Sequence, residues 1–274
     1  MKRFLPYMAV VSARYRMLLQ YRAAAFAGLV TQCFWGALKL MILAAFYAAS
    51  QQDQPMSLPE VVAYIWLGQA FCGMLPWTID GEFAQKVRDG SIAYDLLRPV
   101  DLYALWYSNT LAYRTAPTTL RAIPLGLFAM LLLPRLGLAE WALRAPSSLV
   151  SGGLFGVSLV AAGALSTAIT MLSQLSLLWT ISAAGMDRIM PALVTLFSGM
   201  VVPLPLFPNW LQPLLHWQPF RGLVDVPFRI YSGNIPPPDA LLEIVQQGVW
   251  VGLLVWLGRV MLARGTRKLV VQGG

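Results

Sequence analysis

The stretch that decides the fold is residues 145–186, APSSLVSGGLFGVSLVAAGALSTAITMLSQLSLLWTISAAGM, which contains no charged residue across 42 positions. A bilayer core about 30 Å thick needs roughly 20 apolar residues in helical form. The stretch is therefore either one long helix with flanks or two helices joined by a tight turn. We predict one helix, because Gly153–Thr180 contains no proline. Small residues recur every four positions and predict a closely packed face: Ser158, Ala162, Ser166 and Thr170.

The composition of the whole chain places it in a membrane. Of 274 residues, 58% are hydrophobic and 12% are charged, and the mean hydropathy is +0.62. A soluble domain carries about 25% charged residues. A soluble core cannot absorb this much apolar surface and keep a wettable exterior, so a soluble enzyme is excluded.

Five further apolar runs bring the number of predicted spans to six. The runs are continuous and do not alternate, which favours helices over barrel strands, since unpaired backbone groups are not tolerated in lipid. We therefore predict an all-α integral membrane protein with a single transmembrane domain over residues 1–274. The five runs are Ala23–Ala49, Val61–Ile79, Ala104–Leu133, Ile189–Phe220 and Leu241–Ala263.

The basic residues predict the orientation, because Lys and Arg favour the cytoplasmic side. With the N-terminus inside, 13 of the 20 Lys and Arg residues fall on the cytoplasmic side, 4 on the external side and 3 within spans. We expect both termini to be cytoplasmic, in the plasma (inner) membrane of a bacterium. Juxtamembrane basic residues facing anionic headgroups explain much of the net charge of +8 without nucleic acid.

The N-terminal segment, residues 1–22, is predicted to be a helix lying in the cytoplasmic interface. It is either a simple anchor or a lever attached to the first span. The tail, Arg264–Gly274, is explained by a polybasic membrane stop. The apolar stripe of the N-terminal helix consists of Phe4, Met8, Val11, Tyr15 and Leu18.

The charged loop, residues 80–102, is the one long charge-dense stretch. Glu82 and Lys86 have the spacing of a helical ion pair, Gly90 can end that helix, and Arg98-Pro99 precedes the next span. The sequence predicts a short surface helix and a turn, which is either a solvated loop or a docking face for a soluble partner. The candidate docking residues are Glu82, Lys86, Arg88, Asp89, Asp95, Arg98 and Pro99.

Residues 203–240 are rich in proline and aromatic residues, so they cannot form one straight helix. We expect short re-entrant helices on the external side before the last span. They either cap a pathway through the membrane or form an aromatic belt that holds a loop at the interface.

Charged and polar residues inside the predicted spans are candidates for a substrate pathway. Lys39, Arg114 and Arg121 can attract an anionic group of an amphiphile, but long basic side chains also reach back to the interface. Ser166, Thr170 and Gln174 can line a passage, although hydrogen-bonded helix packing explains them equally well.

Two stretches resemble the type-2 ABC exporter permeases. The run DGSIAYDLLRPVD, residues 89–101, is similar to the first cytoplasmic loop of that superfamily, and LHWQPF, residues 215–220, is similar to the external segment before its last helix. The resemblance implies that the charged loop contacts an ATPase. It also implies two permeases, identical or related, bound to two separate ATPase subunits that carry ATP and Mg, with an amphiphilic or hydrophobic cargo and membrane lipids as further partners.

Signals for catalysis are weak. The chain contains no phosphate loop of the form GxxxxGK[ST], and His216 is the single histidine, so we expect no ATP site, no catalytic residues, no metal and no cofactor on this chain. The alternative is a membrane-embedded lipid headgroup transferase, since Asp80, Gly81 and Ala84 match part of a phosphatidyltransferase metal motif. That motif departs at Trp77 and Gln85, and metal-assisted transfer needs clustered carboxylates.

Overall fold

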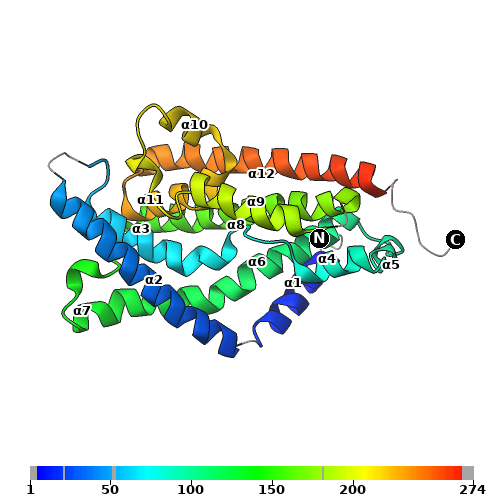
Figure 1. Ribbon diagram of the computed structural model, residues 1–274, viewed down its shortest axis with the longest axis horizontal. Helices are drawn as coiled ribbons and strands as arrows, with labels where there is room; N and C mark the ends of the chain where they lie inside the picture. The colour runs from blue at the N-terminus through cyan, green and yellow to red at the C-terminus, as the bar shows by residue number, and fades with distance from the viewer. Residues whose placement is uncertain (1–4, 21, 51–53, 181, 267–274) are drawn as a thin grey trace.

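The computed structural model describes residues 5–20, 22–50, 54–180 and 182–266, and every regular element in these ranges is helical (Figure 1). The first half contains α1 (Leu5–Leu18), α2 (Arg22–Ala49), α3 (Leu58–Phe71), η1 (Cys72–Met74), α4 (Gly81–Arg88), α5 (Ala93–Leu96), α6 (Leu102–Leu127), η2 (Phe128–Leu132), α7 (Leu133–Arg135) and η3 (Ala139–Trp141). The second half contains α8 (Leu149–Thr180), α9 (Ala184–Phe197), η4 (Leu204–Leu206), α10 (Gln212–Trp217), η5 (Pro219–Leu223), α11 (Asp225–Ser232) and α12 (Pro237–Gly265).

Four helical segments are long and apolar enough to cross a membrane: Gly28–Ala49, Leu102–Arg135, Leu149–Thr180 and Pro237–Gly265. At the other two predicted spans the helices are shorter than the apolar runs. In the run Val61–Ile79, α3 and η1 end at Met74, and Leu75, the residue before Pro76, is extended. In the run Ile189–Phe220, α9 ends at Phe197, and Gly199 then adopts a φ of +85°. Proline and a left-handed residue both end helices, so the length of an apolar run overestimated these two helices.

The prediction of one long helix within residues 145–186 is confirmed by α8, which runs without a break for 32 residues. Its predicted small-residue face is buried completely at Ser158, Ala162 and Ser166. Ser158 donates a hydrogen bond of 2.9 Å to Gln247 of α12. Close packing of α8 on its neighbours therefore uses small side chains, as membrane helices generally do.

Helix α3 lies at the centre of the molecule. Every residue from Val61 to Ala70 is buried, which is consistent with a helix that is apolar on all sides. The Tyr64 ring meets Phe228 of α11 edge to face, with ring centroids 5.5 Å apart. Helix α3 therefore packs directly on α11, which belongs to the predicted external segment.

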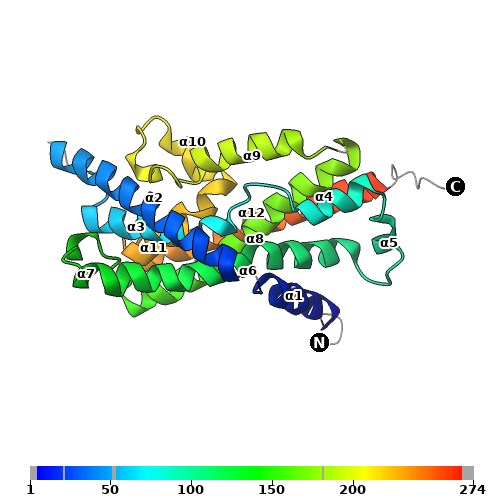
Figure 2. The same ribbon diagram turned by 60° about the horizontal axis from the view of Figure 1, so that its bottom comes forward.

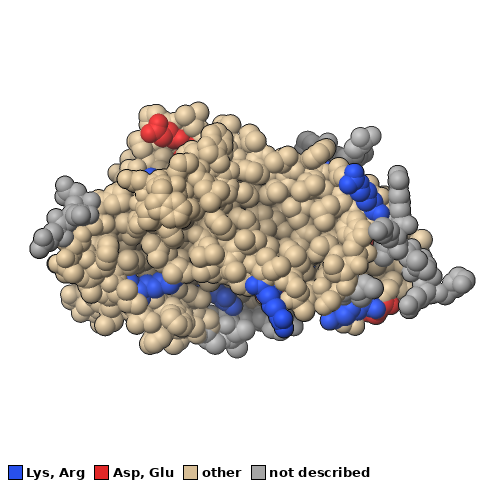
Figure 3. Space-filling model, turned by 45° about the horizontal axis from the view of Figure 1, so that its top comes forward, with Lys and Arg blue, Asp and Glu red and all other residues tan. Residues whose placement is uncertain are grey.

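The elements divide between two ends of an elongated molecule (Figures 1 and 2). Helices α4 and α5, the start of α9 and the last turn of α12 lie at one end, which we call the charged-loop end. Helix α7 and the C-terminal end of α2 lie at the opposite end. In the face shown in Figure 3, residues other than Lys, Arg, Asp and Glu cover most of the area, and a few Lys and Arg side chains appear along its lower edge. A surface poor in charge between the two ends is what a membrane-spanning protein requires.

Helix α1 packs on the rest of the molecule with a face that overlaps the predicted stripe in part, since Val11, Tyr15 and Leu18 are half-buried. Tyr7 and Val10 contact the apolar cluster that contains Phe83 and Trp106, whereas Met8 is exposed. The face that packs also carries Arg14, whose partners are described below. Phe4 of the predicted stripe, together with Arg267 and Lys268 of the predicted basic tail, lies outside the described residues.

The proline-rich stretch from residue 203 to 240 is broken into short helices, as predicted. It consists of η4, α10, η5 and α11, and α12 begins at Pro237. Gly233 ends α11 in the left-handed conformation, with a φ of +85°. The Ser147 side chain lies where a Cβ on that glycine would stand. Both the backbone conformation and this close contact therefore require glycine at position 233.

Candidate functional site

The charged loop folds locally as its sequence predicts. Asp80 is the N-cap of α4, and its side chain accepts a hydrogen bond of 3.1 Å from the backbone N–H of Glu82. Gly90, with a φ of +76°, follows the C-cap and ends the helix. Asp101 caps α6 in the same way by accepting from Ala104 N–H at 2.7 Å. Side-chain caps at both helix starts explain where the loop begins and ends.

Arg14 of α1 fastens α4 to the N-terminal helix. Its guanidinium lies 2.7 Å from the Asp80 carboxylate and 2.9 Å from that of Glu82. Burial raises the pKa of Asp80 above its ordinary value, and the positive charge of Arg14 opposes this shift. Glu82 therefore pairs with Arg14, and the predicted helical pair of Glu82 with Lys86 does not form.

Asp95 occupies the inside of the loop. It is buried, and its carboxylate lies 3.4 Å from both Lys86 and Arg98. The indole N–H of Trp106 donates to the same carboxylate at 3.2 Å. Asp95 therefore holds α5 against α6, and it is the one predicted docking residue that the fold encloses.

Of the remaining predicted docking residues, Lys86 is half-buried and five are exposed. Tyr94 and Leu97 are also 71% and 80% exposed, so the charged loop carries exposed apolar side chains as well. Exposed apolar and charged side chains together are typical of a protein interface. We use the term outer face for Tyr94 and Leu97 together with the five exposed docking residues, Glu82, Arg88, Asp89, Arg98 and Pro99.

The backbone between η1 and α4, residues Leu75–Asp80, is non-helical and is called the connector below. Arg114 of α6 is 4% exposed and donates to Leu75 O at 3.0 Å and to Thr78 O. From α9, the Asp187 carboxylate accepts from Ile79 N–H at 2.9 Å. Side chains from two separate helices thus serve the polar groups of this irregular backbone, which would otherwise be costly away from water.

Three of the predicted pathway residues belong to the same network. Arg114 Nε donates to Thr170 Oγ1 at 3.0 Å, Thr170 donates to Ser166 O at 2.8 Å, and Ser166 donates to Met74 O. One turn further along α8, Gln174 accepts from Thr110 Oγ1 at 2.9 Å. Its Nε2 has no hydrogen-bond partner among the described residues, and Gln174 is one of the residues that line a narrow cavity together with Asp80 and Lys86.

The other two basic residues inside the predicted spans lie apart from this network. Lys39 donates from Nζ to Met200 O at 3.0 Å, which ties α2 to the backbone that follows α9. Arg121 lies beside Gly28 of α2 and Gly73 of η1, and its Nε has no partner among the described residues. The structure therefore brings Arg114, Ser166 and Thr170 together and leaves Lys39 and Arg121 at separate helix contacts.

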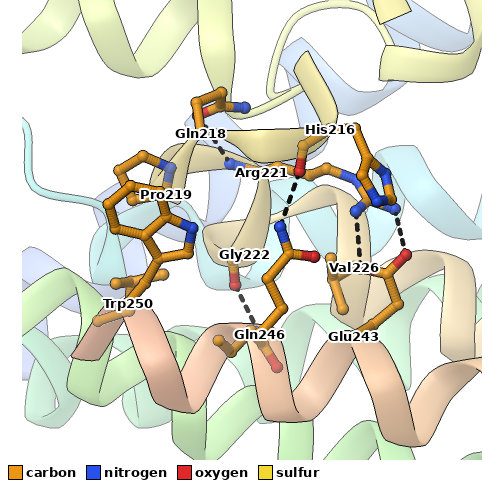
Figure 4. Close-up of a pocket in the computed structure, with 11 residues that line it drawn as sticks. His216, Gln218, Pro219, Arg221, Gly222, Val226, Glu243, Gln246 and Trp250 are labelled. Atoms are coloured by element: carbon orange, nitrogen blue, oxygen red, sulfur yellow. Dashed lines mark hydrogen bonds and ion pairs between the residues drawn. The ribbon is translucent and has the colours of Figure 1, made fainter. Parts of the chain in front are cut away.

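A second group of charges, which we call the buried ion cluster, was not anticipated from the sequence. It consists of Arg221, Asp225, Arg229 and Glu243. Arg221 makes a two-pronged contact with Glu243 at 2.6 and 2.7 Å (Figure 4). Its Nε donates to Asp225 at 3.1 Å. Arg229 reaches the same Asp225 oxygen at 3.1 Å. The sequence does contain a pattern that indicates these ion pairs, because Arg221, Asp225 and Arg229 are spaced i, i+4, i+8.

The pocket beside this cluster is lined by His216, Gln218, Gly222 and Trp250, among others (Figure 4). Gln246 donates to His216 O at 2.9 Å, and Gln247 donates to Gly222 O at 2.7 Å. These bonds join α12 to α10 and η5. The pocket is narrow, and the polar side chains around it are used in joining these elements.

The described residues contain no group of three or more His, Cys, Asp or Glu side chains that could hold a metal ion. Asp80, on which the transferase alternative rests, already accepts from Arg14 and from Glu82 N–H. Its carboxylate is therefore part of the fold of the charged loop.

Comparison with known proteins identifies one family. A family model described as ABC-2 family transporter protein matches residues 33–273. The match includes the connector, the charged loop and the buried ion cluster, whereas α1 with Arg14 lies before it. No curated protein and no solved structure gives a significant match to the chain.

Proposed function

Because the chain belongs to the ABC-2 transporter family, we propose that it is the permease subunit of an ATP-driven exporter. The chain is a multi-pass membrane protein and the membrane component of such a transporter. Members of this family typically lack an ATPase site of their own. The proposal therefore includes two separate ATPase subunits, which bind ATP and Mg.

Six segments cross the membrane in this proposal. The four long helices account for four crossings, and α3 with η1 and α9 account for the two shorter ones. The grouping of α4, α5, the start of α9 and the end of α12 at one end supports this topology, since consecutive loops then alternate between the two sides (Figures 1 and 2). The excess of basic residues assigns the charged-loop end and both termini to the cytoplasm of a bacterial cell.

The ATPase docks on the outer face of the charged loop. The exposed apolar side chains Tyr94 and Leu97, surrounded by charged residues, are the observation that carries this assignment. They project at one end of a chain that is otherwise poor in charge. The helix α1, held to α4 by Arg14, forms part of the same cytoplasmic unit.

The cargo is an amphiphilic or hydrophobic molecule that moves between two permease subunits, identical or related. Lys39, Arg114, Arg121, Ser166, Thr170 and Gln174 stay our candidates for the residues along its path. The short helices of residues 203–240 close the external side of that path. The buried ion cluster supports this role, because it holds η5 and α11 against α12.

The test of the docking assignment is capture of an ATPase from native membranes by the tagged chain. We expect an ATPase to co-purify with the wild-type chain, and a double variant with Arg88→Glu and Leu97→Glu to lose at least tenfold of that capture. Both side chains are exposed and neither pairs with an acidic residue among the described residues, so membrane insertion and thermal stability should be unchanged.

The matched control is Arg135→Glu, which reverses an exposed charge at the opposite end of the molecule. It should capture the ATPase like the wild type. Equal capture by the double variant and the wild type would show that the charged loop is not the docking face.

A further inference from the structure

The connector joins a membrane helix to the docking loop through backbone that is not helical. Along the chain, force on α4 reaches α3 through residues Leu75–Asp80, while Phe83 and Asp95 give the loop a separate contact with Trp106 of α6. A free, irregular segment would bend under that force, whereas a fixed one transmits it. What holds the connector therefore decides how movement of the loop is passed on beyond that direct contact.

The structure shows side chains from four elements on this short stretch. Arg114 of α6 serves two carbonyls, those of Leu75 and Thr78. The carbonyl of Met74, which immediately precedes the connector, accepts from Ser166 of α8. At the other end of the connector, the Ile79 amide donates to Asp187 of α9, and Asp80 pairs with Arg14 of α1.

Arg114 is the central member of this set. Residue 114 lies twelve positions into α6, about 18 Å along the helix from Leu102. At that depth a guanidinium is expensive unless its donors are used, and here Nη1, Nη2 and Nε all donate. Arg114 also lies 5.0 Å from the centre of the Tyr113 ring. One side chain thus ties the connector to α6 and, through Thr170, to α8.

We propose that Arg114 is a positioning residue for energy coupling: it fixes the connector so that displacement of the charged loop is passed to α6 and α8. The inference rests on the proposed function, because it assumes that an ATPase moves the loop. It predicts that loss of Arg114 leaves ATPase capture intact and separates ATP hydrolysis from the response of the membrane helices.

The first experiment uses the full chain alone, reconstituted in nanodiscs, and measures amide hydrogen exchange of residues 75–80. Arg114→Met should speed exchange in this stretch about tenfold or more, since bonds to a charged donor are among the stronger ones. Arg114→Lys should recover part of the protection. The control is Lys39→Met, which removes another buried bond from a cation to a carbonyl but leaves the connector alone.

A second pair of variants tests the connector if Arg114→Met fails to fold. Asp187 is only half-buried, and Asp187→Asn retains an oxygen that accepts from Ile79 N–H, whereas Asp187→Leu does not. Asp187→Leu should therefore speed exchange at Ile79, and Asp187→Asn should not. Unchanged exchange in both Arg114→Met and Asp187→Leu would overturn the proposal.

The second experiment adds the co-purified ATPase and compares exchange in α8 with and without ATP. The wild type should show an ATP-dependent change in α8, and Arg114→Met should lose it while capturing the ATPase normally. An ATP-dependent change that persists in Arg114→Met would overturn the coupling role. If no ATPase binds the wild type, the proposed function fails, while the exchange result on the chain alone still decides whether Arg114 fixes the connector.

Discussion

The buried ion cluster and the charged loop contain similar charges in different surroundings. In the cluster, Asp225 is fully buried and two arginines share one of its oxygens. In the loop, Asp80 and Asp95 are enclosed, but Arg88, Asp89 and Arg98 remain exposed. The ion pairs of the cluster connect η5, α11 and α12, although Asp225 Oδ1 has no hydrogen-bond partner among the described residues, so the cluster is suited to holding these elements together. In the charged loop, the enclosed carboxylates stabilise the fold of the loop. The exposed charges stay available to bind a partner protein.

The largest effect that this comparison predicts is in the buried ion cluster. Arg221→Met leaves Asp225 and Glu243 without their main partner, and breaking a buried ion pair costs about 3–5 kcal/mol. We expect a large loss of stability, measured by thermal unfolding of the detergent-solubilised chain.

The control for this prediction is Arg135→Met, which removes an exposed arginine. It should unfold within experimental error of the wild type. If Arg221→Met were equally stable, the cluster would not hold η5 and α11 to α12, and the contrast with the charged loop would disappear.

A smaller effect is expected where α1 meets α4. Arg14→Gln removes the contacts with Asp80 and Glu82, and a partly buried pair of this kind is worth about 1–3 kcal/mol. Amide exchange in α1 and α4 should increase together, because one side chain joins them.

Arg16→Gln is the matched control for Arg14→Gln. Arg16 lies on the same helix, is exposed and donates to Ser12 within α1. Its replacement should leave exchange in α4 unchanged. Equal effects of the two variants would mean that α1 is not attached to the loop through Arg14.

The smallest effect is expected at the exposed pair of Arg259 and Asp101, whose charged groups lie 2.9 Å apart. Arg259→Gln should cost less than about 1 kcal/mol, because water screens the pair. Partial burial raises the pKa of Asp101, but the Ala104 N–H and Arg259 outweigh it and hold the pKa below its ordinary value.

The stabilisation from Asp101 is therefore present above the ordinary pKa of an aspartate and is lost as the pH falls through the lowered value in the folded state. The free energy of unfolding should fall between pH 7 and pH 3 by slightly less in Arg259→Gln than in the wild type. A larger loss in the variant would contradict the sign of the shift.

Much of the fold follows from the sequence because charge-free runs report helices directly. The run of residues 145–186 predicted α8, and Gly90 predicted the end of α4. The length of α3 did not follow, since hydropathy does not reveal that Arg114 and Asp187 serve the backbone after η1. The length of α9 did not follow either, since hydropathy does not reveal the left-handed conformation of Gly199. Irregular backbone inside a membrane protein depends on partners that are distant in sequence.

The candidate site was predictable in its position but not in its internal contacts. The density of charge marked residues 80–102, yet Arg14 was interpreted as a juxtamembrane basic residue. A signal existed, because Arg14 is four residues after Val10 and seven after Tyr7, on the face of α1 that packs inward. An arginine on a packed face indicates a buried partner, and the nearest unexplained acids were those at the start of α4.

The length of α8 has a consequence for the membrane in which the protein works. Its 32 residues extend about 48 Å, well beyond a hydrocarbon core of about 30 Å. The helix must tilt, or one of its ends must project from the lipid, and the balance between the two depends on hydrophobic thickness. Helix α8 carries Ser166 and Thr170, which bond to Met74 and Arg114 at the connector. The acyl-chain length of the surrounding lipid therefore affects the position of these two side chains relative to the connector.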